Sequence, residues 1–260
     1  MRNKKIILGV VAVILVVLAN IIYLAANLFP DEFLSEGEAI KKLNQAENAI
    51  EVKTVQDVVF LDKKHVFMPF ISADNEYGFS LWEWINGKWR LSEKTVNSSI
   101  NIVKQDENDP STYYFVWNFP EDEQIKKINI YLIRNRSYRG NDEDFYYEPR
   151  LQMGASFDRE KSYGVVPLSG GMLKVYKEMS GISKENGDMF SNIFSTNNEL
   201  YFSWNMIDQK GEVAWIEQRN SSYGGDAKVM SESIFFEDQK DIEFLEWKED
   251  EGKWQNTNKK

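Results

Sequence analysis

A run of 24 uncharged residues near the N-terminus, residues 6–29, constrains this chain more than any other feature. At a rise of about 1.5 Å per residue, such a run forms a helix of roughly 36 Å, and the hydrocarbon core of a bilayer is about 30 Å thick. A helix pairs its own backbone amides, which is what a segment inside lipid requires. The run therefore predicts a single transmembrane helix.

The charges on either side of the run predict its orientation. Three basic residues precede it, whereas Asp31 and Glu32 follow it. Positive charge is retained in the cytoplasm, so we expect residues 1–5 to form a cytoplasmic tip and the C-terminal domain to lie outside the cell. A cleaved signal peptide is the alternative, but its apolar core is about 7–15 residues long and ends at a small-x-small site. The longer run and the bulky Leu24 favour an uncleaved signal-anchor.

The rest of the chain is acidic and has no cysteine. Three of the 31 basic residues and none of the 41 acidic residues precede the run, which leaves a net charge of −13 beyond it. This charge argues against nucleic acid as a partner, because such binding depends on neutralising phosphates. An exported domain without disulfides depends on its core alone, which indicates a bacterial cell envelope, and a Gram-positive one in particular. Eight Trp, 12 Tyr and 16 Phe supply a large core.

Residues 30–50 are expected to form a short juxtamembrane helix and linker. Ser35 is a favourable N-cap, and Glu38 follows it at capping-box spacing. Apolar residues then recur at helical spacing through residues 36–49. We expect this helix to pack on the domain that follows it.

From residue 51 onward the apolar pattern alternates, as is typical of β-strands. The clearest local signal is a hairpin over residues 79–93, because Asn86-Gly87 is the preferred composition of a type I′ turn. A two-residue loop fixes the register of the strands, and side chains alternate between the two faces. The register places three tryptophans on one face of the hairpin: Trp82, Trp84 and Trp89.

Two later stretches read as further hairpins. One is residues 111–134, around the loop PEDEQ, and the other is residues 198–219, around a turn from Asp208 to Gly211. Both begin with the pattern Tyr-Phe-x-Trp-Asn. Either a β-unit was duplicated, or amphipathic hairpins look alike because they need the same residue types. Under duplication two related units fill residues 51–165 and 166–256; otherwise they form one continuous domain.

The predicted fold class is therefore mainly β. The transmembrane helix and the juxtamembrane helix lead into an antiparallel, hairpin-rich ectodomain, which is sandwich-like or built from two related β-units. A minor helical insert is expected near residues 171–194, where Leu173, Tyr176 and Met179 recur at helical spacing. Residues 257–260 are expected to form a disordered tail.

No arrangement of residues is specific for a reaction, a metal or a family. His65 is the only histidine, and a structural role is favoured for it over a zinc site or a catalytic triad. Acidic clusters at residues 106–109, 121–123 and 142–144 lack EF-hand spacing, so solvated loop charge is favoured over a Ca²⁺ site. We assign no catalytic residue, no metal ligand and no cofactor.

The candidate ligand-binding residues are Trp82, Trp84 and Trp89, because aromatic rings that lie exposed on a sheet can stack on sugars. The alternative, that the three rings belong to the core, is favoured. We expect a non-enzymatic, membrane-anchored envelope module that binds a protein, a peptide or a glycan, in an oligomeric state that the sequence leaves open. The alternative function is a carboxylate-dependent envelope glycan hydrolase, which needs two carboxylates placed across a cleft.

Overall fold

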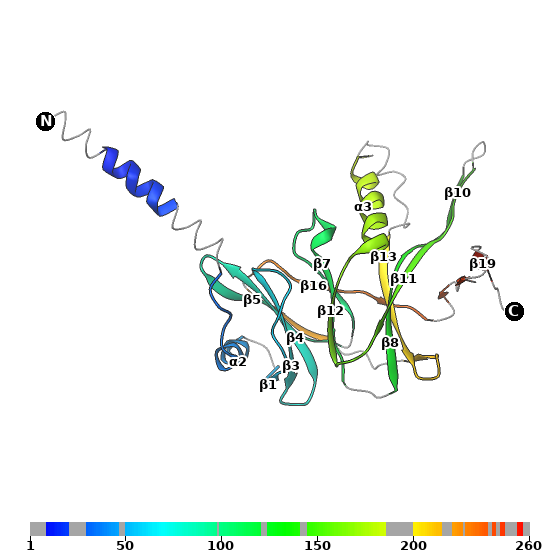
Figure 1. Cartoon of the computed structure of the whole chain (residues 1–260), viewed down its shortest axis with the longest axis horizontal. Coiled ribbons are helices and arrows are strands. Elements are labelled where there is room, and N and C mark those ends of the chain that lie inside the picture. The colour runs from blue at the N-terminus through cyan, green and yellow to red at the C-terminus, as the bar shows by residue number, and fades with distance from the viewer. Residues whose placement is uncertain are drawn as a thin grey trace. The chain divides into compact units, whose positions relative to one another are not determined.

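The fold is mainly β, with antiparallel sheets and few helices, as the sequence predicts (Figure 1). The computed structural model describes residues 9–20, 30–46, 50–97, 99–120, 124–140, 145–185, 200–214, 220–225, 227–238, 241–242, 245–247 and 254–256. The chain divides into two compact units. Unit 1 comprises Met1–Ser98 and Arg219–Ser231, and unit 2 comprises Ser99–Gln218 and Glu232–Lys260. The duplication that would relate residues 51–165 to 166–256 stays a prediction.

The N-terminal run is described only in part. Residues 9–20 are helical, while residues 1–8 and 21–29 lie outside the described residues, as does the predicted tail at 257–260. Among the helices that are described, none combines the length and the apolar character needed to cross a membrane. The transmembrane anchor stays a prediction.

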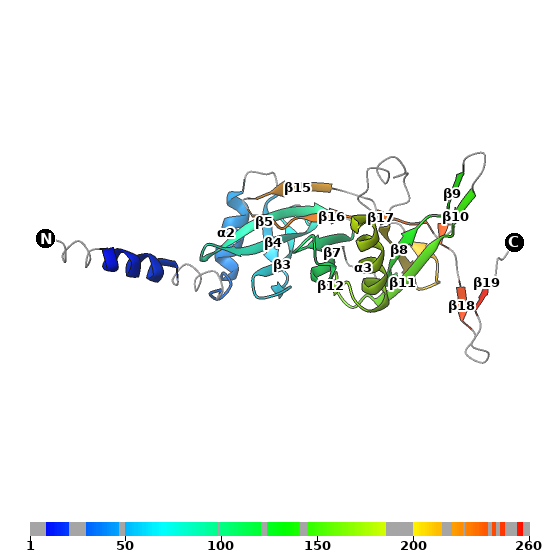
Figure 2. The ribbon, with the colours of Figure 1, turned by 90° about the horizontal axis from the view of Figure 1, so that it is seen from above.

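Unit 1 is a six-stranded sheet with one helix packed on a face (Figure 2). The strand order is β1-β3-β4-β5-β15, and β2 also pairs with β3. The strands are β1 (Val52–Val55), β2 (Val59–Phe60), β3 (His65–Ser72), β4 (Tyr77–Ile85), β5 (Lys88–Asn97) and β15 (Asn220–Gly224). Pro69 lies in β3 opposite the gap between β1 and β2, where its missing N–H costs no ladder bond.

The predicted hairpin is confirmed as β4 and β5. Asn86 and Gly87 have φ angles of 52° and 73°, as a type I′ turn requires. Trp84 pairs with Trp89, and the register shifts at a bulge beyond Trp82. The three tryptophans share the face that packs on helix α2 (Glu36–Gln45).

Helix α2 is held at both ends. Ser35 donates its N–H and its hydroxyl to Glu38 Oε2 over 3.1 and 2.7 Å, so the predicted cap is confirmed. The helix buries Ala39 and Leu43 and ends at residue 45 rather than 49, because Ala46 is extended. At that end a buried lysine from β5, Lys94, donates to the carbonyl of Leu43 over 2.7 Å. A cation at a helix C-terminus is stabilising because it complements the helix dipole.

Unit 2 consists of two sheets whose facing side chains form one core, which is a sandwich-like arrangement. The first sheet has the order β11-β8-β13-β14, with β17 also paired to β13, and the second has the order β12-β7-β6-β16. The first comprises β8 (Ile125–Arg134), β11 (Leu151–Asp158), β13 (Tyr201–Asp208), β14 (Val213–Ala214) and β17 (Phe235–Phe236). The second comprises β6 (Asn101–Lys104), β7 (Tyr113–Asn118), β12 (Tyr163–Pro167) and β16 (Ser231–Ser233).

One predicted hairpin is wrong and another is confirmed. Strands β7 and β8 do not pair with each other: β7 lies in the second sheet and β8 in the first. Each carries apolar side chains for a core shared between two sheets, and the chain between them crosses from one sheet to the other. By contrast, β13 and β14 do form a hairpin. Its turn is closed by Asp208, whose Oδ1 accepts the N–H groups of Lys210 and Glu212.

The predicted helical insert is confirmed as α3 (Gly170–Glu185), and residues 186–199 lie outside the described residues. Tyr176 of α3 stacks on Phe202 of the core with 5.0 Å between ring centroids. The remaining elements are the 3₁₀-helix η1 (Pro110–Thr112) and two two-stranded pairs. These pairs are β9 (Ser137–Gly140) with β10 (Phe145–Glu148), and β18 (Leu245–Trp247) with β19 (Trp254–Asn256).

Candidate functional site

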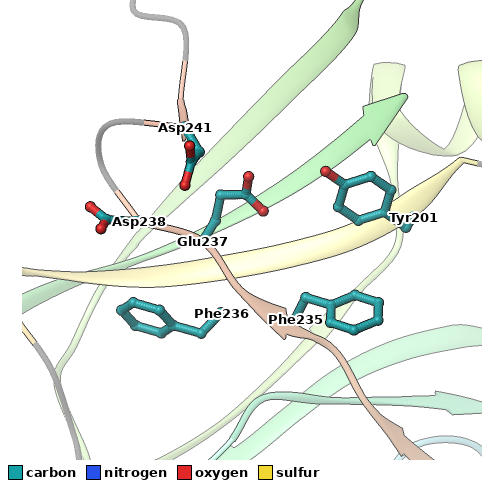
Figure 3. Close-up of a pocket in the computed structure, with 6 residues that line it drawn as sticks. All are labelled: Tyr201, Phe235, Phe236, Glu237, Asp238 and Asp241. Atoms are coloured by element: carbon teal, nitrogen blue, oxygen red, sulfur yellow. The ribbon is translucent and has the colours of Figure 1, made fainter. Parts of the chain in front are cut away.

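A pocket of about 400 Å³ opens in unit 2 where β17 ends beside β13 (Figure 3). Three aromatic side chains and three carboxylates form its lining, which comprises Tyr201, Phe235, Phe236, Glu237, Asp238 and Asp241. The pocket exists because β17 runs parallel to β13 for only two residue pairs, Ser203 with Phe235 and Trp204 with Phe236. The start of β13 therefore stays uncovered, and the chain after β17 forms the pocket wall.

The alternation of a strand sets which rings face the pocket. Ile234 is buried, and its carbonyl accepts the indole N–H of Trp204 over 3.2 Å. Phe236 packs edge-on against Trp204, with 5.2 Å between ring centroids. Between them Phe235 points outward and is 70% exposed. Its ring lies at 88° to that of Tyr201, so two aromatic surfaces meet at the mouth of the pocket.

A buried polar network fixes the backbone beneath the carboxylates. The N–H of Glu237 donates to the carbonyl of Trp204 over 2.8 Å, and Asn205 donates its side-chain amide to the carbonyl of Glu237 over 3.4 Å. The Oδ1 atom of Asn205 accepts in turn from Asn129 and from the hydroxyl of Tyr131. The position of Glu237 is thus set by side chains of β8 and β13.

The carboxyl group of Glu237 points to the side of Tyr201, and that of Asp241 points toward Glu237 (Figure 3). Burial raises the pKa of Glu237 above its usual value, and the negative charge of Asp241 raises it further. The hydroxyl of Ser203 and the guanidinium of Arg150 lower that pKa by a smaller amount. A carboxylate that is disfavoured in this way gains from a nearby cation.

Arg150 is a fixed positive charge at the rim of the pocket. Its Nη2 donates to the carbonyl of Asp241 over 2.7 Å and to Gln152 over 3.1 Å, and its Nη1 donates to Asn135 over 3.3 Å. Among the described residues, this one arginine does not balance the three carboxylates of the lining. The pocket therefore combines negative charge with aromatic surface, which suits a cationic group such as an ammonium or guanidinium.

The three tryptophans that the sequence singles out lie elsewhere, together in the core of unit 1. Trp82, Trp84 and Trp89 are 1%, 5% and 3% exposed, and all three belong to the hydrophobic cluster between the sheet and α2. Trp89 also lines a second pocket, of about 290 Å³, between the end of α2 and β5. Their burial favours the core interpretation; ligand binding by these three residues stays a prediction.

The acidic clusters are accounted for where they are described. Asp109 accepts from Ser111 at the start of η1 and lies 3.0 Å from Nζ of Lys177, and these contacts lower its pKa to about 2. Residues 121–123 and 142–144 lie outside the described residues. Over the part of the chain that is described, no group of three His, Asp or Glu side chains could hold a metal ion.

The pocket could not be predicted from the sequence. Its only local signal is the run FFEDQKD at residues 235–241, in which two aromatics precede three acids. The partner of that run, Tyr201, lies more than thirty residues earlier, and the parallel pairing that joins them has no turn to predict it. Comparison of the chain with known protein families, with curated proteins and with solved structures finds no match. A function for this pocket can therefore be proposed only from its geometry.

Proposed function

We propose that this protein is a membrane-anchored, extracytoplasmic module of the bacterial envelope that binds a cationic side chain of a protein or peptide. The uncharged residues 6–29 supply the anchor, and the charges on either side of it place the N-terminus in the cytoplasm. Attachment to a membrane raises the effective concentration of a module near partners that share the surface.

The observation that carries the binding proposal is the pocket formed by Tyr201, Phe235, Glu237 and Asp241. A lysine or arginine that enters it would meet ring surfaces from Tyr201 and Phe235 and two carboxylates that point toward the same space. Burial raises the pKa of Glu237, and a bound cation would lower that pKa again because it favours the carboxylate form. Binding is therefore expected to release protons and to weaken as the pH falls.

The experiment is a titration of the full chain in detergent with a lysine-bearing peptide. Glu237→Gln removes one carboxylate charge, and we expect it to weaken binding by about twofold to fivefold, the range of a partly exposed ion pair. The matched control is Asp158→Asn, which removes the same charge at an exposed site on β11. Equal affinity for the peptide with acetylated lysines, or equal loss in both variants, would contradict the proposal.

A carboxylate-dependent glycan hydrolase is the second candidate. One observation favours it: burial raises the pKa of Glu237, as a proton-donating carboxyl requires, and Asp241 lies in the same pocket. The discriminating measurement is the appearance of new reducing ends when the protein is incubated with envelope glycan. Activity that Glu237→Gln abolishes and Asp158→Asn retains supports the hydrolase, and the absence of new reducing ends excludes it for that glycan.

A further inference from the structure

The segment that follows the predicted anchor is fixed to one end of the sheet in unit 1. The indole N–H of Trp89 donates to the carbonyl of Asp31 over 3.2 Å. The ring of Phe33 lies edge-on to Trp89 and to Trp82, with centroid distances of 5.1 and 5.7 Å. The contacts with the sheet therefore begin at Asp31, two residues beyond the end of the predicted span.

This end of the sheet presents an apolar ring to solvent. Phe60 of β2 contacts Phe33 and Trp89 edge-on, at 6.3 and 6.1 Å, and it is 52% exposed. Its neighbours in the cluster are buried or partly buried. An apolar ring that stays exposed in this way can bury its surface at the boundary between lipid headgroups and acyl chains.

Three lysines lie at the same end of the sheet as the exposed ring. Lys63 and Lys88 are exposed, Lys88 directly precedes Trp89, and the carbonyl of Lys64 accepts the N–H of Trp84 over 2.8 Å, which places all three at the same end of the sheet. Of the acidic residues nearby, Asp62 and Glu83 are both paired with His65. Asp31 and Glu32 are exposed in the connecting segment.

The length of chain between the predicted span and Asp31 limits how far this end of the sheet can lie from the membrane. Two residues span at most about 7 Å, whatever their conformation. The headgroup layer on each side of a bilayer is roughly 5–8 Å thick, from the difference between the total and the hydrocarbon thickness. If residue 29 ends the span, Asp31 lies in the headgroup layer. The ring contacts then bring Phe60 to the same depth.

We propose that this end of unit 1, with Phe60, Lys63 and Lys88, rests on the lipid headgroups of the membrane that holds the anchor. Phe60 enters the interface, and the lysines extend to phosphate oxygens. The acidic net charge of the rest of the chain confines the contact to this end. The opposite end, the β3–β4 turn at residues 73–76, stands about 26 Å away, since eight residues of strand separate the two ends at about 3.3 Å each. The proposal rests on the anchor of the proposed function.

The test uses the absence of cysteine, which lets a single introduced thiol carry a label at one known position. The full chain is reconstituted into vesicles of phosphatidylcholine and phosphatidylglycerol, with a lipid that carries a quencher near its headgroup. An environment-sensitive fluorophore is attached at Phe60→Cys, at Lys88→Cys or, as the control, at Asp74→Cys in the exposed β3–β4 turn. We expect blue-shifted, quenched emission at positions 60 and 88, and unshifted, unquenched emission at 74.

Two failures are distinguishable. A chain that does not float with the vesicles contradicts the anchor itself, and with it the membrane contact. A chain that floats but shows equal emission and equal quenching at all three positions retains the anchor and overturns the contact. Because Lys88 is exposed at the start of β5, its label also reports the contact if Phe60→Cys disturbs the aromatic cluster.

Discussion

The Nδ1 atom of His65 lies 2.9 Å from Oδ1 of Asp62, and its Nε2 atom lies 3.8 Å from Oε1 of Glu83. Burial lowers the pKa of His65, but hydrogen bonds and charge from the two carboxylates outweigh it and raise that pKa to about 9. The only histidine of the chain is thus a structural cross-link between β3 and β4, the role that the sequence favoured.

The first prediction is a pH dependence of stability that His65 creates. A pKa raised from 6.5 to about 9 means that the folded state binds the proton more tightly, so the stabilisation is complete below pH 6.5 and is lost as the pH rises through about 9. Its size is on the order of 1–3 kcal/mol, because Asp62 is partly exposed. Urea unfolding at several pH values should show this loss in the wild type and not in His65→Gln. Parallel curves for the two proteins would contradict the cross-link.

The second prediction concerns the tryptophan cluster. Because Trp84 is 5% exposed, Trp84→Ala should lower the free energy of unfolding by roughly 3–5 kcal/mol. Thermal unfolding of residues 30–260 measures it. If the free energy of unfolding stays within about 0.5 kcal/mol of the wild-type value while glycan binding is lost, Trp84 is instead a ligand-binding surface.

The third prediction concerns the β4–β5 turn. Gly87 has a φ of 73°, which a β-branched residue strongly disfavours, so Gly87→Val should cost about 1–3 kcal/mol. Lys88→Val is the control, because Lys88 is next to Gly87 but has an extended backbone and an exposed side chain. Similar urea midpoints for the two variants would show that the turn tolerates another conformation.

The fourth prediction concerns a close approach in unit 2. Gly164 of β12 pairs with Trp117 of β7, and a Cβ atom at residue 164 would overlap the indole ring. Gly164→Ala should therefore destabilise the protein by about 1–3 kcal/mol through overpacking. Gly37→Ala is the matched control: it lies in α2 with no atom near its Cβ position, and it should be neutral or stabilising by up to about 1 kcal/mol. Equal effects in the two variants would count against the packing of Trp117.

The fifth prediction is the topology of the chain in the membrane. Protease added to intact, wall-stripped cells should digest the domain beyond residue 30 and leave a short N-terminal remnant. A domain that stays protected until the cells are lysed would reverse the orientation. Protein found mainly in the medium and beginning near residue 26 would show that the run is a cleaved signal.

Features set by neighbouring residues could be predicted from the sequence. The Asn86-Gly87 turn fixes the β4–β5 register, and Ser35 with Glu38 fixes the start of α2, because each is determined within a few positions. The local sequence pattern of β7, β8 and the loop between them is also that of a hairpin, yet these two strands do not pair. Whether two amphipathic strands pair with each other or face each other across a core depends on partners far along the chain, here β13 and β12.

The candidate site could not be predicted from the sequence either, because it too depends on residues that are far apart in the chain. The charge-bearing side chains Glu237 and Asp241 follow a two-residue strand, and the binding role proposed for them also needs Tyr201, which comes near them only through the parallel pairing of β13 and β17. The tryptophans were easier to find because aromatic alternation marks any half-buried strand. That pattern reports burial, and it does so correctly here.

Strand β15 has a consequence for how the protein is made. It pairs with β5 over five residues, from Asn220 with Asn97 to Gly224 with Glu93, although all of residues 99–218 lie between the two strands in the chain. During synthesis, β5 leaves the ribosome long before its neighbour exists, and its outer edge offers unpaired backbone groups until residue 224 follows. The sheet nearest the N-terminus is therefore among the last parts of the chain to be completed, and a ribosome that stops within unit 2 releases a protein with an open, adhesive edge.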